Sequence, residues 1–262
     1  MIASQNGEVV LQGNPGYPAG IAQGLKAPFA LECHDAIGST NDRARALGRT
    51  GDHDIVVVAA RQTSGRGRRD RTWTSPPGGM WGSVVVRPSF PRDRWSLLTF
   101  AGAVAVVAAV ETLDVDARIK WPNDVLLGES GGKLAGVLTV SGRSTAGEPW
   151  VGVGIGVNAD VDPAALPAGA ASLRSVVDGV DRCRLGRSLL EAFDAIRDRP
   201  DAILTQWRAA ADTLGRRVRV ETPDGPVVGR AEGVDGSGAL RVATDGEVQT
   251  VTVGDCEHLR PA

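Results

Sequence analysis

The chain has 262 residues, of which 42% are hydrophobic and 23% are charged, and its formal net charge is −2. This length allows one sizeable hydrophobic core and a small second domain, and the composition is ordinary for a soluble globular protein. The near-neutral charge excludes a chain coated in positive charge for binding nucleic acid.

The first third of the chain contains the predicted start of the core. Residues 1–28 are rich in Gly and Pro and show no periodicity, which predicts a loosely ordered lead-in. Thr40 or Asn41 is expected to cap a short helix that runs to Leu47. Apolar, largely β-branched stretches predict strands over 29–34, 54–60 and 83–88.

The middle of the chain predicts one buried helix followed by strands. Residues 94–113 are apolar around most of the helical circumference, yet the run 97–110 is about four residues too short to span a membrane. Short strands are then expected at 117–121, 124–127, 134–140 and 150–158. Two further helices are expected at 186–198 and 201–215, with Gly215 as the C-terminal stop of the second.

The pattern of the sequence changes after Gly215 from helical spacing of apolar residues to short strand-like stretches. Strand-like stretches alternate with PDG, DGSG and DG turns, so we expect four or five short strands in fewer than 50 residues. Such a segment is typical of a small β-barrel. We therefore expect an α+β main domain over 29–214 and a barrel domain over 215–262.

Segments rich in glycine and polar residues lie at predicted strand ends, where they can converge on one pocket. They are 38–41, 61–73, 120–124, 131–136 and 152–158.

The segment GRGRRDR at 65–71 places four arginines in seven residues. Gly65 and Gly67 allow close backbone approach, and guanidinium groups bind carboxylate or phosphate with bidentate geometry. A solvated basic hairpin would account for the arginines alone. Gln62 and Trp73 add an amide and a flat stacking surface, which favours an anion-binding loop. Because ordering the loop costs roughly 1–2 kcal/mol per residue, we expect it to close over an anionic ligand.

Lysine is rare in this chain. Only Lys26, Lys120 and Lys133 occur among 29 basic residues, and the last two lie in KWPND and GGKLAG. Lysine supplies a compact, rotatable ammonium group where arginine supplies a planar fork. Asp124 of KWPND could orient a lysine or hold Mg²⁺. A plain turn is the alternative for each segment.

Three other patterns resemble known nucleotide-binding or metal-binding motifs without matching them. GESGGK at 128–133 is one residue short of P-loop spacing, and GVGIGVN at 152–158 has its third glycine too early for a dinucleotide fingerprint. Cys33 with His34 and Cys256 with His258 make a formal four-ligand zinc set, but adjacent residues such as Cys33 and His34 rarely point both side chains at one metal. Three scattered cysteines and no signal peptide predict a cytoplasmic protein without disulfides.

Taken in order, STN, QTSGRGRRDRTW, KWPNDV, GGKLAGVL and GVGIGVN resemble the motifs of biotin protein ligases. The resemblance implies the mixed-sheet catalytic domain of the biotin/lipoate ligases, of class II synthetase-like type, followed by an SH3-like barrel. In that family, biotin's carboxylate attacks the α-phosphorus of ATP, giving biotinyl-5′-adenylate and pyrophosphate, and a carrier lysine then displaces AMP. Both reactants of the first step are anions, which would account for the arginine loop.

The resemblance also implies roles for individual residues. Lys133, Arg66 and Arg68 would be catalytic, and Asp124 would contact Mg²⁺. Biotin would be bound by Ser39, Thr40, Asn41, Gln62, Gly65, Arg66, Gly67, Arg68, Lys133 and Gly136. ATP would be bound by Arg68, Arg71, Trp73, Lys120, Asn123, Asp124, Lys133 and Asn158.

The expected partners are biotin, ATP and the biotin carboxyl carrier domain of an acyl-CoA carboxylase, without a membrane. Many family members add an N-terminal DNA-binding domain, but only 28 residues precede the first predicted strand, so we expect no DNA binding. A monomer or weak homodimer is expected. The alternatives are a lipoate or octanoate ligase of the same fold and a non-catalytic RNA-binding module; the loop motif and the barrel favour biotin.

Overall fold

The computed structural model describes residues 16–69, 71–128 and 131–259. Its larger sheet has the strand order β1-β2-β3-β7-β6-β5-β4. Only β1 and β2 run parallel and the other neighbours are antiparallel, so the sheet is mixed, as predicted. The strands are β1 (Ala30–His34), β2 (Ile55–Ala59), β3 (Met80–Val86), β4 (Ala117–Lys120), β5 (Asp124–Leu127), β6 (Gly132–Arg143) and β7 (Pro149–Val157).

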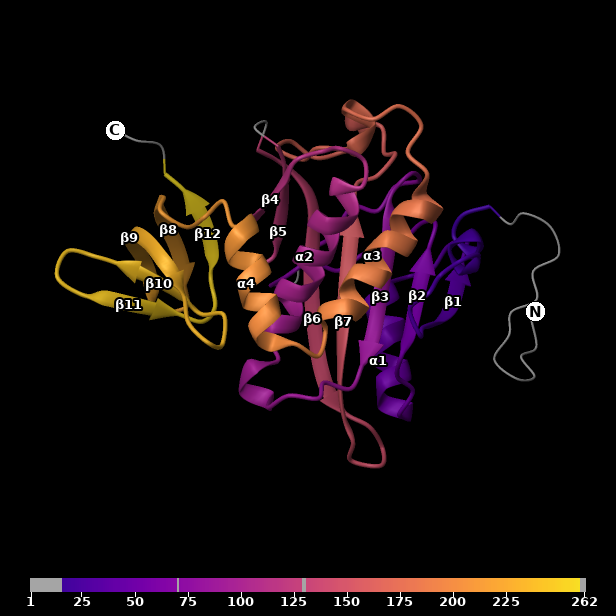
Figure 1. Ribbon diagram of the computed structural model, residues 1–262, viewed down its shortest axis with the longest axis horizontal. Coiled ribbons are helices and arrows are strands. Elements are labelled where there is room, and N and C mark those ends of the chain that lie inside the picture. The colour runs from indigo at the N-terminus through magenta and orange to yellow at the C-terminus, as the bar shows by residue number, and fades with distance from the viewer. Residues whose placement is uncertain (1–15, 70, 129–130, 260–262) are drawn as a thin grey trace.

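Helices cover both faces of this sheet (Figure 1). The helices are α1 (Thr40–Thr50), α2 (Leu97–Glu111), α3 (Arg182–Ile196) and α4 (Pro200–Ala210), with short 3₁₀ turns at Ala19–Ala22, Arg92–Arg94, Pro163–Ala165 and Leu173–Ser175. Successive side chains of a strand point to opposite faces. Val56 and Val58 accordingly belong to the large core that also contains α2 and α3, whereas Val57 packs with Ala44 and Leu47 of α1 on the other face.

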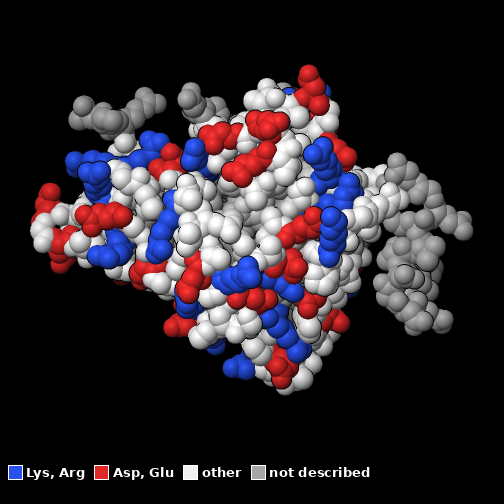
Figure 2. All heavy atoms as spheres, viewed as in Figure 1, with Lys and Arg blue, Asp and Glu red and all other residues white. Residues whose placement is uncertain are grey.

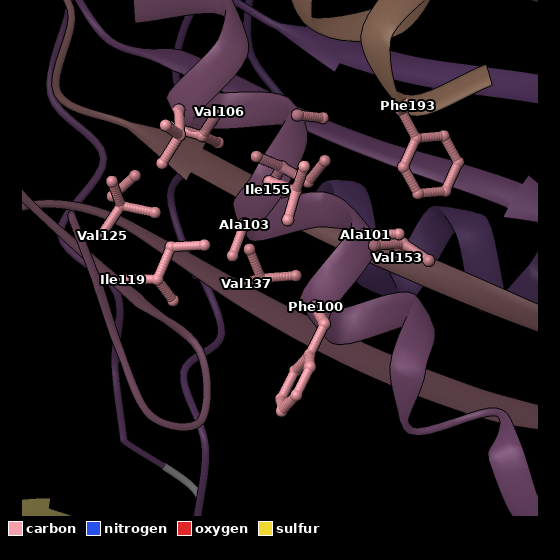
Figure 3. Close-up of a cluster of buried hydrophobic side chains, with 14 of the residues drawn as sticks. Phe100, Ala101, Ala103, Val106, Ile119, Val125, Val137, Val153, Ile155 and Phe193 are labelled. Atoms are coloured by element: carbon pink, nitrogen blue, oxygen red, sulfur yellow. The ribbon is translucent and has the colours of Figure 1, made fainter. Parts of the chain in front are cut away.

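The centre of the large core is α2, whose burial confirms the predicted apolar helix. Phe100, Ala101 and Ala103 of α2 belong to one buried cluster with Val137, Val153 and Ile155 of the sheet (Figure 3), and Gly102 is the α2 residue that lies directly against Val137 and Val153. Phe100 also stacks on Trp207 of α4 with ring centroids 4.3 Å apart. Among the described residues, none of the helices has the length and apolar character needed to cross a bilayer.

The described part of the lead-in is packed, which corrects the expectation of loose order for residues 16–28. Ile21 is fully buried against α3, at a point where a side chain on Gly186 would lie 2.9 Å from the Ile21 Cδ1 atom. Arg182 stacks over the ring of Tyr17 at 4.2 Å. Residues 1–15 lie outside the described residues.

Several helix ends differ from the prediction: α1 continues past Leu47 to Thr50, α2 is shorter than 94–113, and α3 begins at Arg182 instead of 186. Two further differences have a local cause. The N-cap of α1 is Ser39 rather than Thr40 or Asn41, because the Ser39 side chain accepts a hydrogen bond from the Asp42 amide. Helix α4 ends at Ala210, before Gly215, because Ala211 turns extended and bridges Ile119 of β4. Pairing with the sheet therefore ends α4, and Gly215 does not.

The C-terminal segment forms an antiparallel sheet with the order β11-β10-β9-β8-β12. The predicted short strands are confirmed. Within the described residues the sheet is not closed, because β12 crosses over to pair with β8 and leaves β11 at the opposite edge, so an SH3-like barrel stays a prediction. The strands are β8 (Arg217–Thr222), β9 (Gly225–Val234), β10 (Leu240–Ala243), β11 (Val248–Val251) and β12 (Asp255–His258).

Hydrogen bonds to backbone carbonyls hold this second sheet beside α4, at one end of the molecule (Figure 1). The Trp121 indole donates to the Gly238 carbonyl at 3.1 Å, and Arg94 donates to that of Gly236 at 3.0 Å. Arg208 of α4 donates to the Val234 carbonyl at 3.0 Å. The C-terminal sheet is thus tied to the KWPND segment through Trp121, to the turn before α2 through Arg94, and to α4 through Arg208.

Candidate active site

A pocket lies at the N-terminus of α1, against β6 and β7, where the arginine loop (residues 64–73) crosses the sheet. It brings together most of the residues that the sequence singled out. Those lining it are Ser39, Thr40, Asn41, Gln62, Arg66, Gly67, Arg68, Arg71, Trp73, Asn123, Asp124, Lys133 and Gly136.

A polar network fixes one end of the pocket. The Gln62 side-chain oxygen accepts hydrogen bonds from the Thr40 amide at 2.8 Å and the Thr40 hydroxyl at 3.1 Å. The Gln62 amide group donates to Ser75, and the Ser83 hydroxyl donates to Thr40. The side-chain oxygen of Asn41 is buried without a hydrogen-bond partner, so it can accept a hydrogen bond from a ligand N–H group.

The arginine loop folds back on itself and crosses the pocket. Within it the Gly67 amide donates to the Arg71 carbonyl at 2.7 Å. At its two sides Arg66 pairs with Asp42 of α1 at 3.1 Å, and Arg68 donates to the Asn123 side-chain oxygen at 2.9 Å. We expected an anionic ligand to order these guanidinium groups. In the structure, a carboxylate and a side-chain amide of the protein itself hold them.

Arg68 is the least exposed of the loop's described arginines. Its side chain is 22% exposed, and burial lowers the pKa of its guanidinium while Asp255 and Asp124 oppose that shift. A charge in so enclosed a position interacts with a neighbouring anion more strongly than a charge in water does.

Lys133 lies at the start of β6 and points into the pocket. Its Nζ atom is 2.7 Å from a carboxylate oxygen of Asp124 and 5.0 Å from the centroid of the Trp73 ring. The Lys133 backbone is fixed as well, because its amide donates to the Gly169 carbonyl at 2.8 Å. The ammonium group is therefore oriented by one carboxylate and one aromatic face.

Two glycines form the seat of Trp73. Gly136 and Gly156 are register partners in β6 and β7. A Cβ on Gly136 would lie 2.9 Å from the indole, and one on Gly156 would lie 2.8 Å from its Nε1 atom. That nitrogen is buried without a hydrogen-bond partner. The indole therefore lies directly on the sheet because neither glycine has a side chain.

Three predicted site residues do not line this pocket. Gly65 closes the base of the arginine loop, where its carbonyl accepts from the Trp73 amide. Lys120 lines a separate surface pocket with Glu257 and His258. Asn158 is buried beneath the site and donates to the Lys133 carbonyl at 3.3 Å and to the Ala171 carbonyl at 2.9 Å. In this structure Asn158 supports the backbone of Lys133.

The sequence interpretation missed several residues of the site. Ser83 could have been found, since a hydroxyl in the apolar strand MWGSVVV needs a buried partner. Asp255 could not have been found, because no motif near it in the sequence indicates the pocket that it lines.

The described residues of the pocket offer few free ligands for a metal ion. Its two carboxylates among the described residues, Asp124 and Asp255, are both paired with cationic side chains. No group of three or more His, Cys, Asp or Glu that could hold a metal ion is found in the part of the chain that the structure describes.

Comparison with known proteins gives a consistent result. A family model described as "Biotin/lipoate A/B protein ligase family" matches residues 36–160, and one described as "Biotin protein ligase C terminal domain" matches 213–259. The chain is 36% identical to the biotin–[acetyl-CoA-carboxylase] ligase of Mycobacterium tuberculosis, over 85% of this chain and 86% of that protein. It is 32% identical to the bifunctional ligase/repressor BirA of Bacillus subtilis, over 86% of this chain and 72% of that protein.

A solved structure shows the same fold. The biotin protein ligase of Aquifex aeolicus in complex with biotin and ATP aligns with a TM-score of 0.70 at 24% identity. The alignment covers 88% of this chain and 99% of that one, so the likeness includes both sheets.

Proposed function

The chain belongs to the biotin/lipoate A/B protein ligase family, and from this membership and the pocket geometry we propose that it is an ATP-dependent biotin protein ligase. The observation that carries the proposal is the convergence of Lys133, Arg66, Arg68 and Arg71 on one pocket beside the Asn41 and Gln62 amides. Cationic groups suit two anionic reactants, and a neutral polar end suits a urea-like ring.

The first step joins the biotin carboxylate to the α-phosphorus of ATP and releases pyrophosphate. Lys133 is positioned between the carboxylate and the α-phosphate, where its charge offsets their repulsion and the charge that builds up in the transition state. Arg68 supplies a second, enclosed charge from the loop. Asn41, Thr40 and Gln62 hold the ureido group at the other end of the pocket.

The second step transfers biotin to a lysine of a carboxylase's carrier domain and releases AMP. Asp124 is held at the pocket by Lys133 and is placed to accept a proton from an incoming ammonium group. Mg²⁺ would offset phosphate charge as the counter-ion of ATP, and Asp124 is the side chain of the pocket that would hold it.

Two alternatives are less well supported. A lipoate or octanoate ligase would share the first family model, but the match of 213–259 is to a biotin ligase C-terminal domain. An RNA-binding module would need a basic surface, whereas Lys and Arg lie among Asp and Glu on the face seen in Figure 2.

A cytoplasmic location is supported by three cysteines that are all free thiols.

Pyrophosphate release tests the proposal. The protein is incubated with ATP and Mg²⁺, and biotin or lipoate is supplied separately without a carrier protein. We expect a burst of pyrophosphate with biotin only. A burst with lipoate only would move the protein to the lipoate ligases, and silence with both would contradict adenylation.

The seat of Trp73 gives a second test. Gly156→Ala places a methyl group 2.8 Å from the indole nitrogen, so the ring has to move off the sheet. Overpacking of this kind costs about 1–3 kcal/mol. We expect the KM for ATP to rise roughly tenfold in pyrophosphate-release assays, since the displaced ring lies in the proposed nucleotide site. Gly233→Ala, in the open space of β9, is the matched control and should leave that KM unchanged.

A further inference from the structure

One carboxylate of the C-terminal sheet meets three arginines of the loop. Asp255, the first residue of β12, lies 3.6 Å from a guanidinium nitrogen of Arg68 and 3.4 Å from one of Arg69, and it also accepts a hydrogen bond from Arg71. The neighbouring carbonyls take part, because Arg68 donates to that of Gly254 at 2.9 Å and Arg69 to that of Glu221 at 3.1 Å.

These contacts cross a large distance in the sequence and join two sheets. Asp255 is 184 residues from Arg71, and it is brought to the pocket by the pairing of β12 with β8 and by the docking of the C-terminal sheet beside α4. Its side chain is 28% exposed, so solvent screens the pairs only in part.

Without this carboxylate the loop tip would be difficult to order. Arg68, Arg69 and Arg71 carry three positive charges within four residues of the sequence, against one negative charge on Asp70, and each arginine side chain loses rotamer freedom when it is fixed. Asp255 supplies a second negative charge, so the group keeps a net positive charge, and Arg68 and Arg71 line the pocket. The tip is thereby held in place while it can still attract a polyanion.

We propose that Asp255 is a positioning residue, through which the C-terminal sheet holds the arginine loop over the pocket before ATP binds. This inference rests on the proposed adenylation site for its kinetic consequence. If Asp255 is lost, ATP itself must order the loop, and that ordering cost weakens the apparent affinity. Once ATP is bound, its phosphates hold the loop, so the chemical step changes little.

Asp255→Asn tests the proposal by two measurements. In pyrophosphate release, we expect the KM for ATP to rise about tenfold while kcat changes less than about threefold. In limited trypsin digestion without ligands, we expect cleavage after the loop arginines to become several-fold faster. Asp255→Glu keeps the charge and should restore both values to within about twofold. Asp224→Asn, an exposed carboxylate in the β8–β9 turn of the same sheet, should behave as the wild type.

The outcomes separate this inference from the proposed function. An unchanged or lower KM for ATP, or a fall in kcat alone, would overturn the positioning role. Unchanged trypsin cleavage in Asp255→Asn would overturn it as well, even if the wild type releases no pyrophosphate with biotin. Failure of Asp255→Glu to restore trypsin resistance would show that the carboxylate's charge is not what holds the loop.

Discussion

Lys133→Ala is expected to lower the rate of adenylate formation about 100-fold or more, which is the scale for removing one preorganised charge donor from an active site. The ammonium group is 2.7 Å from Asp124 and lies over Trp73, so the substitution also leaves the Asp124 carboxylate without its partner in the pocket. Single-turnover formation of biotinyl-adenylate from ATP and biotin measures the effect directly.

Lys26→Ala is the matched control, because Lys26 is exposed in the packed part of the lead-in. Its rate should stay within about twofold of the wild type. Lys133→Arg adds a second comparison, since it keeps the charge but replaces a compact ammonium with a planar fork. A Lys133→Ala variant with nearly full activity would remove Lys133 from the proposed mechanism.

Arg68→Ala is expected to lower kcat/KM for ATP by about 100-fold. The Arg68 guanidinium is the least exposed of those described in the loop, and it is aimed by Asn123 on one side and by the Gly254 carbonyl on the other. An oriented, charge-assisted contact to phosphate is stronger than one made by a solvated side chain. Initial rates at varied ATP and saturating biotin give the ratio.

Arg61→Ala provides the comparison for Arg68, because Arg61 is exposed just before Gln62 and lies outside the pocket lining. Its kcat/KM should match the wild type. If the two alanine variants lose activity equally, the effect would come from general charge near the pocket, and the specific role of Arg68 would be wrong.

Local patterns in the sequence were sufficient for most of the secondary structure. The apolar circumference of 94–113 predicts a helix that has to be buried, and α2 (Leu97–Glu111) lies within that range. The alternating strands and DG-type turns after Gly215 predict short antiparallel strands, and β8 to β12 confirm them. These features depend on the spacing of apolar residues along the chain. That spacing is a property of the sequence itself and needs no contact between distant residues.

Motif residues on loops were also predictable, although their exact partners were not. The polar segments at strand ends do converge on one pocket, because strand ends on one side of a sheet lie together. Lys120 does not line that pocket. It belongs to the same KWPND motif as Asn123, yet it lines a separate pocket beside the C-terminal sheet, whereas Asn123 and Asp124 line the first.

The sequence by itself determined the strands, the buried helix, the arginine loop and the family to which they point. Only the tertiary structure decided that Ile21 fills the space above Gly186, that Asn158 supports Lys133 from below, and that Asp255 meets the loop. Each of these contacts joins residues far apart in the chain. Their energies arise from burial and charge at surfaces that exist only after the sheets and helices have packed, so no local pattern encodes them.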